Sequence, residues 1–142
     1  MKKIRELLVD KGTEIWSVAP TDSVYDGLAL MAEKNIGALL VMDRDRLVGI
    51  LTERDYTRDV ALQGRTAKGT QAGEIMTSRP VCVGPEQTVE ECMALMTDKR
   101  VRHLPVIEGD RVVGLVSIGD AVKATISEQR FIIKQLEQYI SG

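Results

Sequence analysis

An internal repeat without a gap is the feature that most constrains how this 142-residue chain can fold. When the chain is shifted by 65 residues, the segment from Pro20 to Asp55 aligns with the segment from Pro85 to Asp120. Thirteen of the thirty-six aligned pairs are identical, whereas ordinary residue frequencies would give about two or three. The chain therefore contains a duplicated unit, and the same elements are expected twice.

Each repeat has the pattern strand, helix, strand, strand, helix. Ser23 and Thr88 are each followed three residues later by an acidic residue, which is the pattern of a helix N-cap, and apolar residues then recur at helical spacing. Four short apolar runs predict two β-hairpins, at residues 38–42 with 47–51 and at 104–107 with 112–116. Further helices are predicted to begin after Thr52 and Ser117, and the second is expected to continue to about Ile140, because it contains no proline and no glycine after Gly119. Residues 63–73 are glycine-rich and polar, as expected of a linker.

One repeat of this size, with a three-stranded sheet, has one apolar face and little core of its own. We therefore expect an α/β (α+β) fold in which two pseudo-twofold related β-α-β-β-α repeats pack sheet to sheet, with flanking N- and C-terminal helices. The expected divisions are 1–66 for the first helix and repeat 1, 67–126 for the linker and repeat 2, and 127–142 for a C-terminal helix. Ile132, Leu136 and Ile140 form an apolar stripe on that helix, which predicts a homodimer.

Composition excludes several functional classes. The net charge of −2 argues against a nucleic-acid binder that relies on overall positive charge, and the longest apolar run, residues 36–42, is too short to cross a membrane. Asp10 interrupts the only apolar stretch near the N-terminus, so no signal peptide is predicted. With two cysteines, Cys82 and Cys92, and one histidine, we expect a cytoplasmic protein without a metal site.

The two hairpin segments, GALLVMDRDRLVGILTERD and VRHLPVIEGDRVVGLVSIGD, resemble the cystathionine β-synthase (CBS) domain. Each ends in Ser/Thr-x-x-Asp where a strand passes into a helix, at the same offset in both repeats. Over residues 8–126 the chain is similar to the tandem pair called a Bateman module, in a stand-alone bacterial form. The resemblance implies a regulatory module that binds adenosine-containing ligands such as AMP, ADP, ATP, NAD or S-adenosylmethionine in clefts between the repeats.

The resemblance also implies roles for particular residues. The Asp would accept hydrogen bonds from both ribose hydroxyls, the Ser or Thr would help to hold ribose or phosphate, and adenine would lie against the first strand of the other repeat. The implied nucleotide-binding residues are Thr13, Trp16, Ser17, Ile36, Gly37, Ala38, Thr52, Arg54, Asp55, Val81, Val101, Arg102, His103, Leu104, Pro105, Ser117 and Asp120. No catalytic residue and no metal ligand is implied.

Several of these residues have a structural alternative. The Ser/Thr-x-x-Asp motifs at residues 52–55 and 117–120 also match capping boxes that only stabilise a helix. Arg54 is either a phosphate ligand or a solvated surface residue. The pair Arg102 and His103 is either a phosphate contact or a strand edge, and Trp16 lies either beside the adenine or in the core.

Three functional classes remain to be compared. A nucleotide-sensing module explains both the duplication and the two motifs, and it would act on a separate partner protein. A ligand-free dimerisation or scaffold protein would have the same fold with vestigial sites. An enzyme is not predicted, since the sequence holds no paired-carboxylate, triad or metal constellation and needs no catalytic cofactor.

Overall fold

The computed structural model describes residues 1–12 and 14–141, and these form two compact units. The first, here called the repeat-2 unit, combines residues 1–12 with residues 82–108 and 113–141. The second, here called the repeat-1 unit, consists of residues 14–81 together with residues 109–112.

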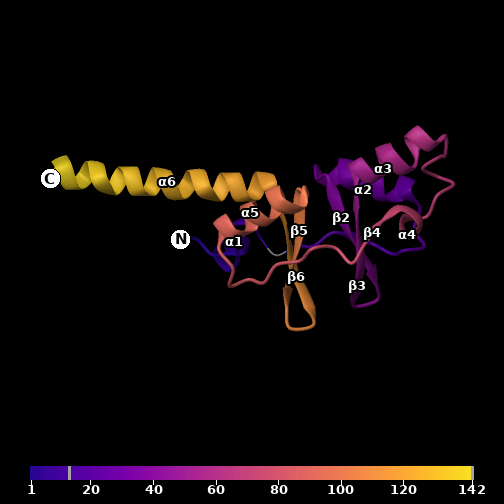
Figure 1. Cartoon of the computed structure of the whole chain (residues 1–142), viewed down its shortest axis with the longest axis horizontal. Coiled ribbons are helices and arrows are strands. Elements are labelled where there is room, and N and C mark those ends of the chain that lie inside the picture. Colours follow the sequence, from indigo (N-terminus) through magenta and orange to yellow (C-terminus); the bar gives the residue numbers. More distant parts are fainter. Residues whose placement is uncertain (13, 142) are drawn as a thin grey trace. The chain divides into compact units, whose positions relative to one another are not determined.

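The repeat-1 unit is a four-stranded sheet covered by helices (Figure 1). Its elements are β1 (Ser17–Val18), α2 (Val24–Lys34), β2 (Ala38–Asp43), β3 (Arg46–Thr52), α3 (Glu53–Asp59), the 3-10 helix η1 (Ala61–Gln63), α4 (Ala72–Ile75) and β4 (Thr77–Ser78). The strand order is β1-β2-β3-β4, in which β1 pairs parallel with β2 and the other pairs are antiparallel. Leu39, Val41 and Leu51 of the central hairpin pack with Val24 and Met31 of α2 in the core of this unit.

The repeat-2 unit contains α1 (Ile4–Lys11), α5 (Val89–Lys99), β5 (His103–Glu108), most of β6 (Arg111–Ser117) and α6 (Ile118–Ser141). Its sheet is the β5-β6 hairpin, which a single parallel bridge between Val83 and Val106 extends by one residue. Backbone hydrogen bonds join α1 to the start of α5, since the N–H of Val89 donates to the carbonyl of Lys2 at 2.9 Å. The first helix of the chain is therefore a built-in part of the second repeat's unit.

The duplicated sequence forms the same local structure twice. Ser23 Oγ accepts the N–H of Asp26 at the start of α2, and Thr88 Oγ1 accepts the N–H of Glu91 at the start of α5, which confirms both predicted caps. Asn35 and Arg100 end these two helices in the left-handed conformation, with the same φ of 55°. The two predicted hairpins and the long C-terminal helix are also confirmed.

The prediction of a three-stranded sheet in each repeat is wrong, because the sheets have four strands and two. In repeat 1, residues after the linker form β4 and pair with β3. In repeat 2, the expected first strand shrinks to the bridge at Val83. Pro80 and Pro85 flank this bridge, and proline has no N–H to donate to a strand partner. The packing of the two repeats sheet to sheet and the division of the chain at residues 66 and 126 stay predictions.

Gly49 and Gly114 occupy equivalent positions in the two repeats but have different surroundings. A Cβ atom at Gly49 would lie 2.9 Å from the carbonyl oxygen of Thr77, which is β4 backbone, and 2.6 Å from Sδ of Met76. At Gly114 it would lie 2.6 Å from Cδ2 of Leu8, the flexible tip of an α1 side chain. The two glycines therefore differ in how easily their neighbours can move.

We expect Gly49→Ala to lower the free energy of unfolding by about 1–3 kcal/mol, because overpacking would push β4 away from β3. Gly114→Ala should lower the free energy of unfolding by clearly less, because the Leu8 side chain can change rotamer. Urea unfolding monitored by circular dichroism measures the free energy of unfolding of both variants. An equal or larger loss for Gly114→Ala would show that the Leu8 side chain is no easier to displace than the β4 backbone.

Candidate functional site

Two strand-to-helix junctions carry the candidate sites. At the end of β3, the N–H of Thr52 donates to Oδ2 of Asp55 at 2.9 Å, and the N–H of Asp55 donates to Oγ1 of Thr52 at 3.0 Å. At the end of β6, Ser117 and Asp120 form the same pair of hydrogen bonds at 2.9 and 3.0 Å. Both aspartates are half-buried. The motif that occurs twice in the sequence therefore builds the same reciprocal capping box twice.

The residues that precede the hairpin lie against each junction. The N–H of Glu53, the first residue of α3, donates to the carbonyl of Gly37 at 3.1 Å. In the second repeat, the N–H of Ile118 donates to the carbonyl of Arg102 at 2.8 Å. Gly37 with Ala38, and Arg102 with His103, are therefore equivalent pairs at the entrance of β2 and β5. The small pair leaves room at one junction, while the second junction has two basic side chains.

Two other predicted residues of repeat 1, Trp16 and Ser17, lie beside β2. The carbonyl of Trp16 accepts the N–H of Leu40 at 3.3 Å, and Ser17 pairs with Leu40 where β1 runs parallel to β2. The Trp16 ring is partly buried against the core of the repeat-1 unit, and Nζ of Lys34 lies 4.2 Å above its centroid. The structure thus gives Trp16 a packing role and a cation–π contact.

The remaining predicted residues divide between the two units. Ile36 is partly buried against the repeat-1 core, and Arg54 is exposed on α3. Val81 belongs to the repeat-1 unit, whereas Val101 and the strand residues Leu104 and Pro105 belong to the repeat-2 unit. Thr13 lies outside the described residues.

Lys11 is a site residue that no sequence pattern predicted. Its Nζ lies 2.6 Å from Oδ2 of Asp120 and donates to the carbonyl of Leu115 at 2.5 Å. Lys11 is in the last turn of α1, 109 positions before Asp120, and no motif connects the two residues. Within the described part of the chain, no lysine or arginine forms an ion pair with Asp55.

Asp55 and Asp120 differ in their pKa values because Lys11 pairs with Asp120. Burial raises the pKa of Asp55 above its usual value, and the hydrogen bonds from Thr52 and Thr77 only partly offset this effect. Burial also acts to raise the pKa of Asp120, but the bond from Lys11 and the bonds from Ser117 together hold it below the usual value. Lys11 therefore makes Asp120 the better-stabilised anion.

His103 is mostly neutral at pH 7. Burial lowers its pKa below the usual 6.5, and the charges of Lys11 and Arg102 lower it further against the opposing effect of Asp120. Cys92 is also buried, and burial, helped by the charge of Asp120, raises the pKa of its thiol to about 11. Lys11 pairs directly with Asp120, and Lys2 and Lys123 line the same pocket.

No group of three or more histidine, cysteine, aspartate or glutamate side chains that could hold a metal ion occurs among residues 1–12 and 14–141. In the same residues, no helix combines the length and the hydropathy needed to cross a membrane.

Comparison with known proteins adds the family. The family model of the CBS domain matches twice, at residues 4–61 and 72–127. The chain is 43% identical over 136 residues to the mitochondrial CBS domain-containing protein CBSX3 of Arabidopsis thaliana, covering 92% of this chain and 66% of that protein. It is 30% identical over 117 residues to the CBS domain-containing protein YhcV of Bacillus subtilis, covering 82% of this chain and 83% of that protein.

A solved structure of a protein with CBS domains from Burkholderia ambifaria superposes with a TM-score of 0.87, at 51% identity, covering 90% of this chain and 96% of that one. The resemblance inferred from the two hairpin segments is therefore confirmed over nearly the whole chain. Two family matches, one on each copy of the internal repeat, show that this chain belongs to the CBS-domain family as a tandem CBS-domain protein.

Proposed function

We propose that the chain is a regulatory module that binds adenosine-containing nucleotides, such as AMP, ATP or NAD, at its two strand-to-helix junctions. The observation that carries the proposal is the half-buried aspartate that follows a strand in both repeats. A carboxylate offers several lone pairs, so it can accept from both hydroxyls of a ribose while keeping its helix-capping bond. A helix N-terminus beside it favours the negative charge of a phosphate.

The two junctions should prefer different ligands. Lys11 pairs with Asp120, Lys2 and Lys123 line the same pocket, and the polar His103 lies nearby, whereas Asp55 adjoins the small residues Gly37 and Ala38 and the carboxylate of Asp59. Positive charge near Asp120 favours a ligand with several phosphate charges. The junction at Asp55 suits a ligand with less negative charge, with Arg54 as its nearest basic residue in the chain.

A scaffold without ligand is the second candidate function, and the same hydrogen bonds favour it. Both aspartates already act as helix caps, so their presence alone does not require a nucleotide. The remaining residues implied by the resemblance, from Trp16 to Pro105, enter the proposal as the walls of the two sites. Binding measurements separate the two functions.

The proposed module would act on a separate partner protein. We further propose that it works as a homodimer through its flanking helices. We also propose a reducing compartment such as the cytoplasm, because two cysteines ten positions apart form no disulfide framework.

The first test replaces each aspartate by asparagine. Asp55→Asn and Asp120→Asn keep an oxygen that can accept the capping N–H, but they remove the charge that holds two ribose hydroxyls. Each charge-assisted hydrogen bond contributes about 1.5–3 kcal/mol, so each variant should lose at least about tenfold in affinity at one class of site and keep the other. Isothermal titration calorimetry with AMP, ATP and NAD, and with GMP for comparison, measures this.

Glu91→Gln is the matched control, because Glu91 caps α5 in the same way but lies in neither junction. It should leave all binding unchanged. If both aspartate variants bind as the unaltered protein does, the aspartates are only helix caps and the site assignment is wrong. If no adenosine compound binds at millimolar concentration, the chain is a scaffold and the nucleotide proposal is wrong.

The second test concerns Lys11. In Lys11→Gln, burial dominates, so the pKa of Asp120 should rise above that of a free aspartate, while the pKa of Asp55 stays unchanged as an internal control. With Lys11 present, the folded pKa of Asp120 lies below its unfolded value of 3.8. Its contribution to stability is therefore present above pH 3.8 and is lost as the pH falls through the folded pKa.

Carbon-13 NMR titration of the aspartate carboxyls follows both groups. In calorimetry, Lys11→Gln should weaken the binding of ATP more than the binding of adenosine, because the variant loses a positive charge that would attract the phosphates. An unchanged Asp120 pKa would show that Lys11 does not pair with it in solution. An equal loss for ATP and adenosine would exclude Lys11 as a phosphate contact.

A further inference from the structure

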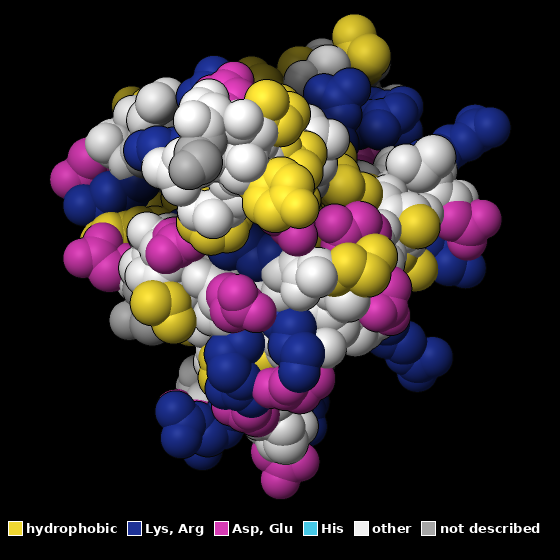
Figure 2. Space-filling model, turned by 90° about the vertical axis from the view of Figure 1, so that its left-hand side faces the viewer, with side chains coloured by type: hydrophobic (Ala, Val, Ile, Leu, Met, Phe, Trp, Pro, Cys, Tyr) yellow, Lys and Arg dark blue, Asp and Glu magenta, His cyan; other side chains and the backbone are white. Residues whose placement is uncertain are grey.

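The C-terminal half of α6 carries large apolar side chains that are about half or more exposed. Figure 1 shows that α6 continues well past α1 and α5, the helices beside its first half. The exposed apolar residues of α6 are 43–87% accessible, and they are Val122, Ile126, Phe131, Ile132, Ile133, Leu136, Tyr139 and Ile140. Hydrophobic side chains also gather on one side of this end of the molecule in Figure 2. A single exposed helical extension of this length is only marginally stable in water, so α6 needs a partner.

The apolar residues of α6 follow a heptad pattern. Val122, Ile126, Gln129, Ile133, Leu136 and Ile140 are spaced alternately four and three residues apart. In the notation abcdefg, isoleucine occupies each a position (126, 133, 140), and Val122, Gln129 and Leu136 occupy the d positions. This is the arrangement of a coiled coil with one polar residue among the seam positions of each helix. The apolar stripe predicted from sequence, Ile132 with Leu136 and Ile140, is one edge of this seam.

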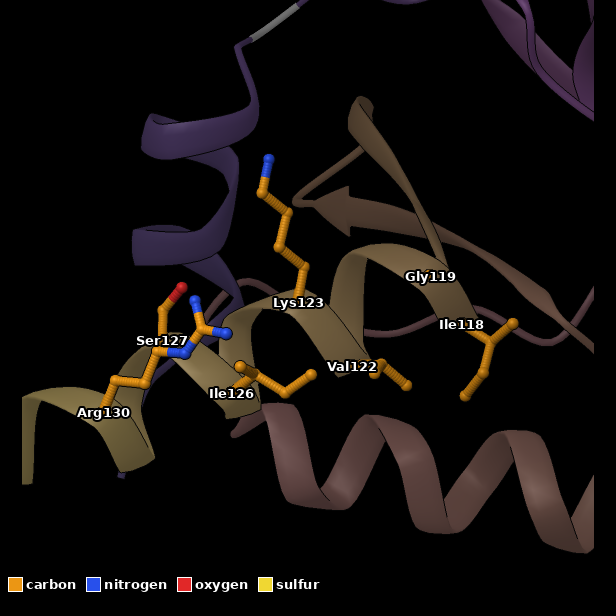
Figure 3. A pocket seen from close by; sticks show the side chains of 7 residues that line it. All are labelled: Ile118, Gly119, Val122, Lys123, Ile126, Ser127 and Arg130. Atoms are coloured by element: carbon orange, nitrogen blue, oxygen red, sulfur yellow. The ribbon is translucent and has the colours of Figure 1, made fainter. Parts of the chain in front are cut away.

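The seam begins beside the folded part of the repeat-2 unit. Figure 3 shows Ile118, Val122 and Ile126 projecting from α6 on the side of α5, in a groove that Lys123 and Arg130 also line. A different face of α6 is buried against the unit, through Ala121 and Ala124. The α6 helix thus packs on its own unit with one face and presents the seam on another.

We infer that the seam of α6 is covered by α6 of a second copy of this chain, in antiparallel orientation. The inference rests on the homodimer proposed above but not on nucleotide binding. In this arrangement Val122 meets Ile140 of the second copy, Ile126 meets its Leu136, and Gln129 meets its Ile133. Every seam residue is then covered, including those in the groove beside the unit.

Residues at the edges of the seam decide the orientation. In antiparallel coiled coils the e positions of the two helices face each other, as do the g positions, whereas in parallel ones e faces g. The e positions hold Lys123, Arg130 and Glu137, and the g positions hold Thr125, Ile132 and Tyr139. The antiparallel pair therefore joins Lys123 to Glu137 twice and Ile132 to Ile132 once, although it brings two Arg130 side chains near each other. The parallel pair would place Ile132 beside Glu137 and form no ion pair.

The first experiment uses two aspartate substitutions on the intact protein. Ile133→Asp puts a charge into the centre of the seam, and we expect it to raise the dimer dissociation constant at least about a hundredfold. Phe131→Asp is the matched control, because Phe131 is at least as exposed as Ile133 but lies outside the seam, at position f. It should leave the dimer intact. Sedimentation equilibrium measures both constants, and circular dichroism checks that both variants fold.

The second experiment tests the orientation by exchanging charges. Lys123→Glu alone should weaken the dimer about tenfold at low salt, and adding Glu137→Lys should restore it. Failure of the double variant to restore the dimer would exclude the antiparallel pairing.

Other outcomes overturn the inference in distinguishable ways. A monomer at tens of micromolar would refute any pairing of α6. A dimer or larger assembly that survives Ile133→Asp would show that other helices form the interface, and equal sensitivity to Phe131→Asp would show only unspecific association. Calorimetry with AMP on the same samples reports nucleotide binding separately, so its loss or retention does not decide the question of α6.

Discussion

The hydrogen-bonded junction between the second hairpin strand and the following helix is the constraint on which the arrangement of each repeat depends. Thr52 with Asp55, and Ser117 with Asp120, bind each other's backbone N–H groups and so determine where the strand ends and where the helix begins. The backbone bonds from Glu53 to Gly37 and from Ile118 to Arg102 tie the entrance of the hairpin to the same point. One local interaction therefore holds three elements together, and it does so with a half-buried carboxylate whose ionisation depends on its surroundings.

Identical junctions can still differ in chemistry because their surroundings come from elsewhere in the chain. Lys11 reaches Asp120 from α1, whereas α4, the helix at the corresponding place in the other repeat, is followed by Met76 where α1 has Lys11. As a result, burial raises the pKa of Asp55, while the ion pair with Lys11 helps to hold the pKa of Asp120 below its usual value. Duplication thus supplies two similar frames, and the flanking segments make them unequal. For a sensor of several related ligands, such inequality would allow the two junctions to respond to different ones.

The flanking helices have a second consequence, because α6 is far longer than its contacts with its own unit require. Ala121 and Ala124 are buried where α6 packs on the unit, and the residues after Glu128 are exposed. An exposed isoleucine at every a position has a cost in solubility unless another surface covers it. If a second copy does so, the helix that begins at the Asp120 junction is also the helix that joins two molecules. Ligand binding at Asp120 and the pairing of subunits would then share one rigid element.

Local sequence patterns by themselves determined much of the secondary structure of this protein. The repeat, both hairpins, the caps at Ser23 and Thr88, the capping boxes at Asp55 and Asp120 and the length of α6 all follow from interactions between residues a few positions apart, which a sequence displays directly. Only the tertiary structure decided what depends on contacts distant in sequence. It attached β4 to β3, reduced the first strand of repeat 2 to a bridge at Val83, and brought Lys11 to Asp120. No periodicity encodes such contacts, because they depend on how whole elements pack, and the pKa of each aspartate depends on them in turn.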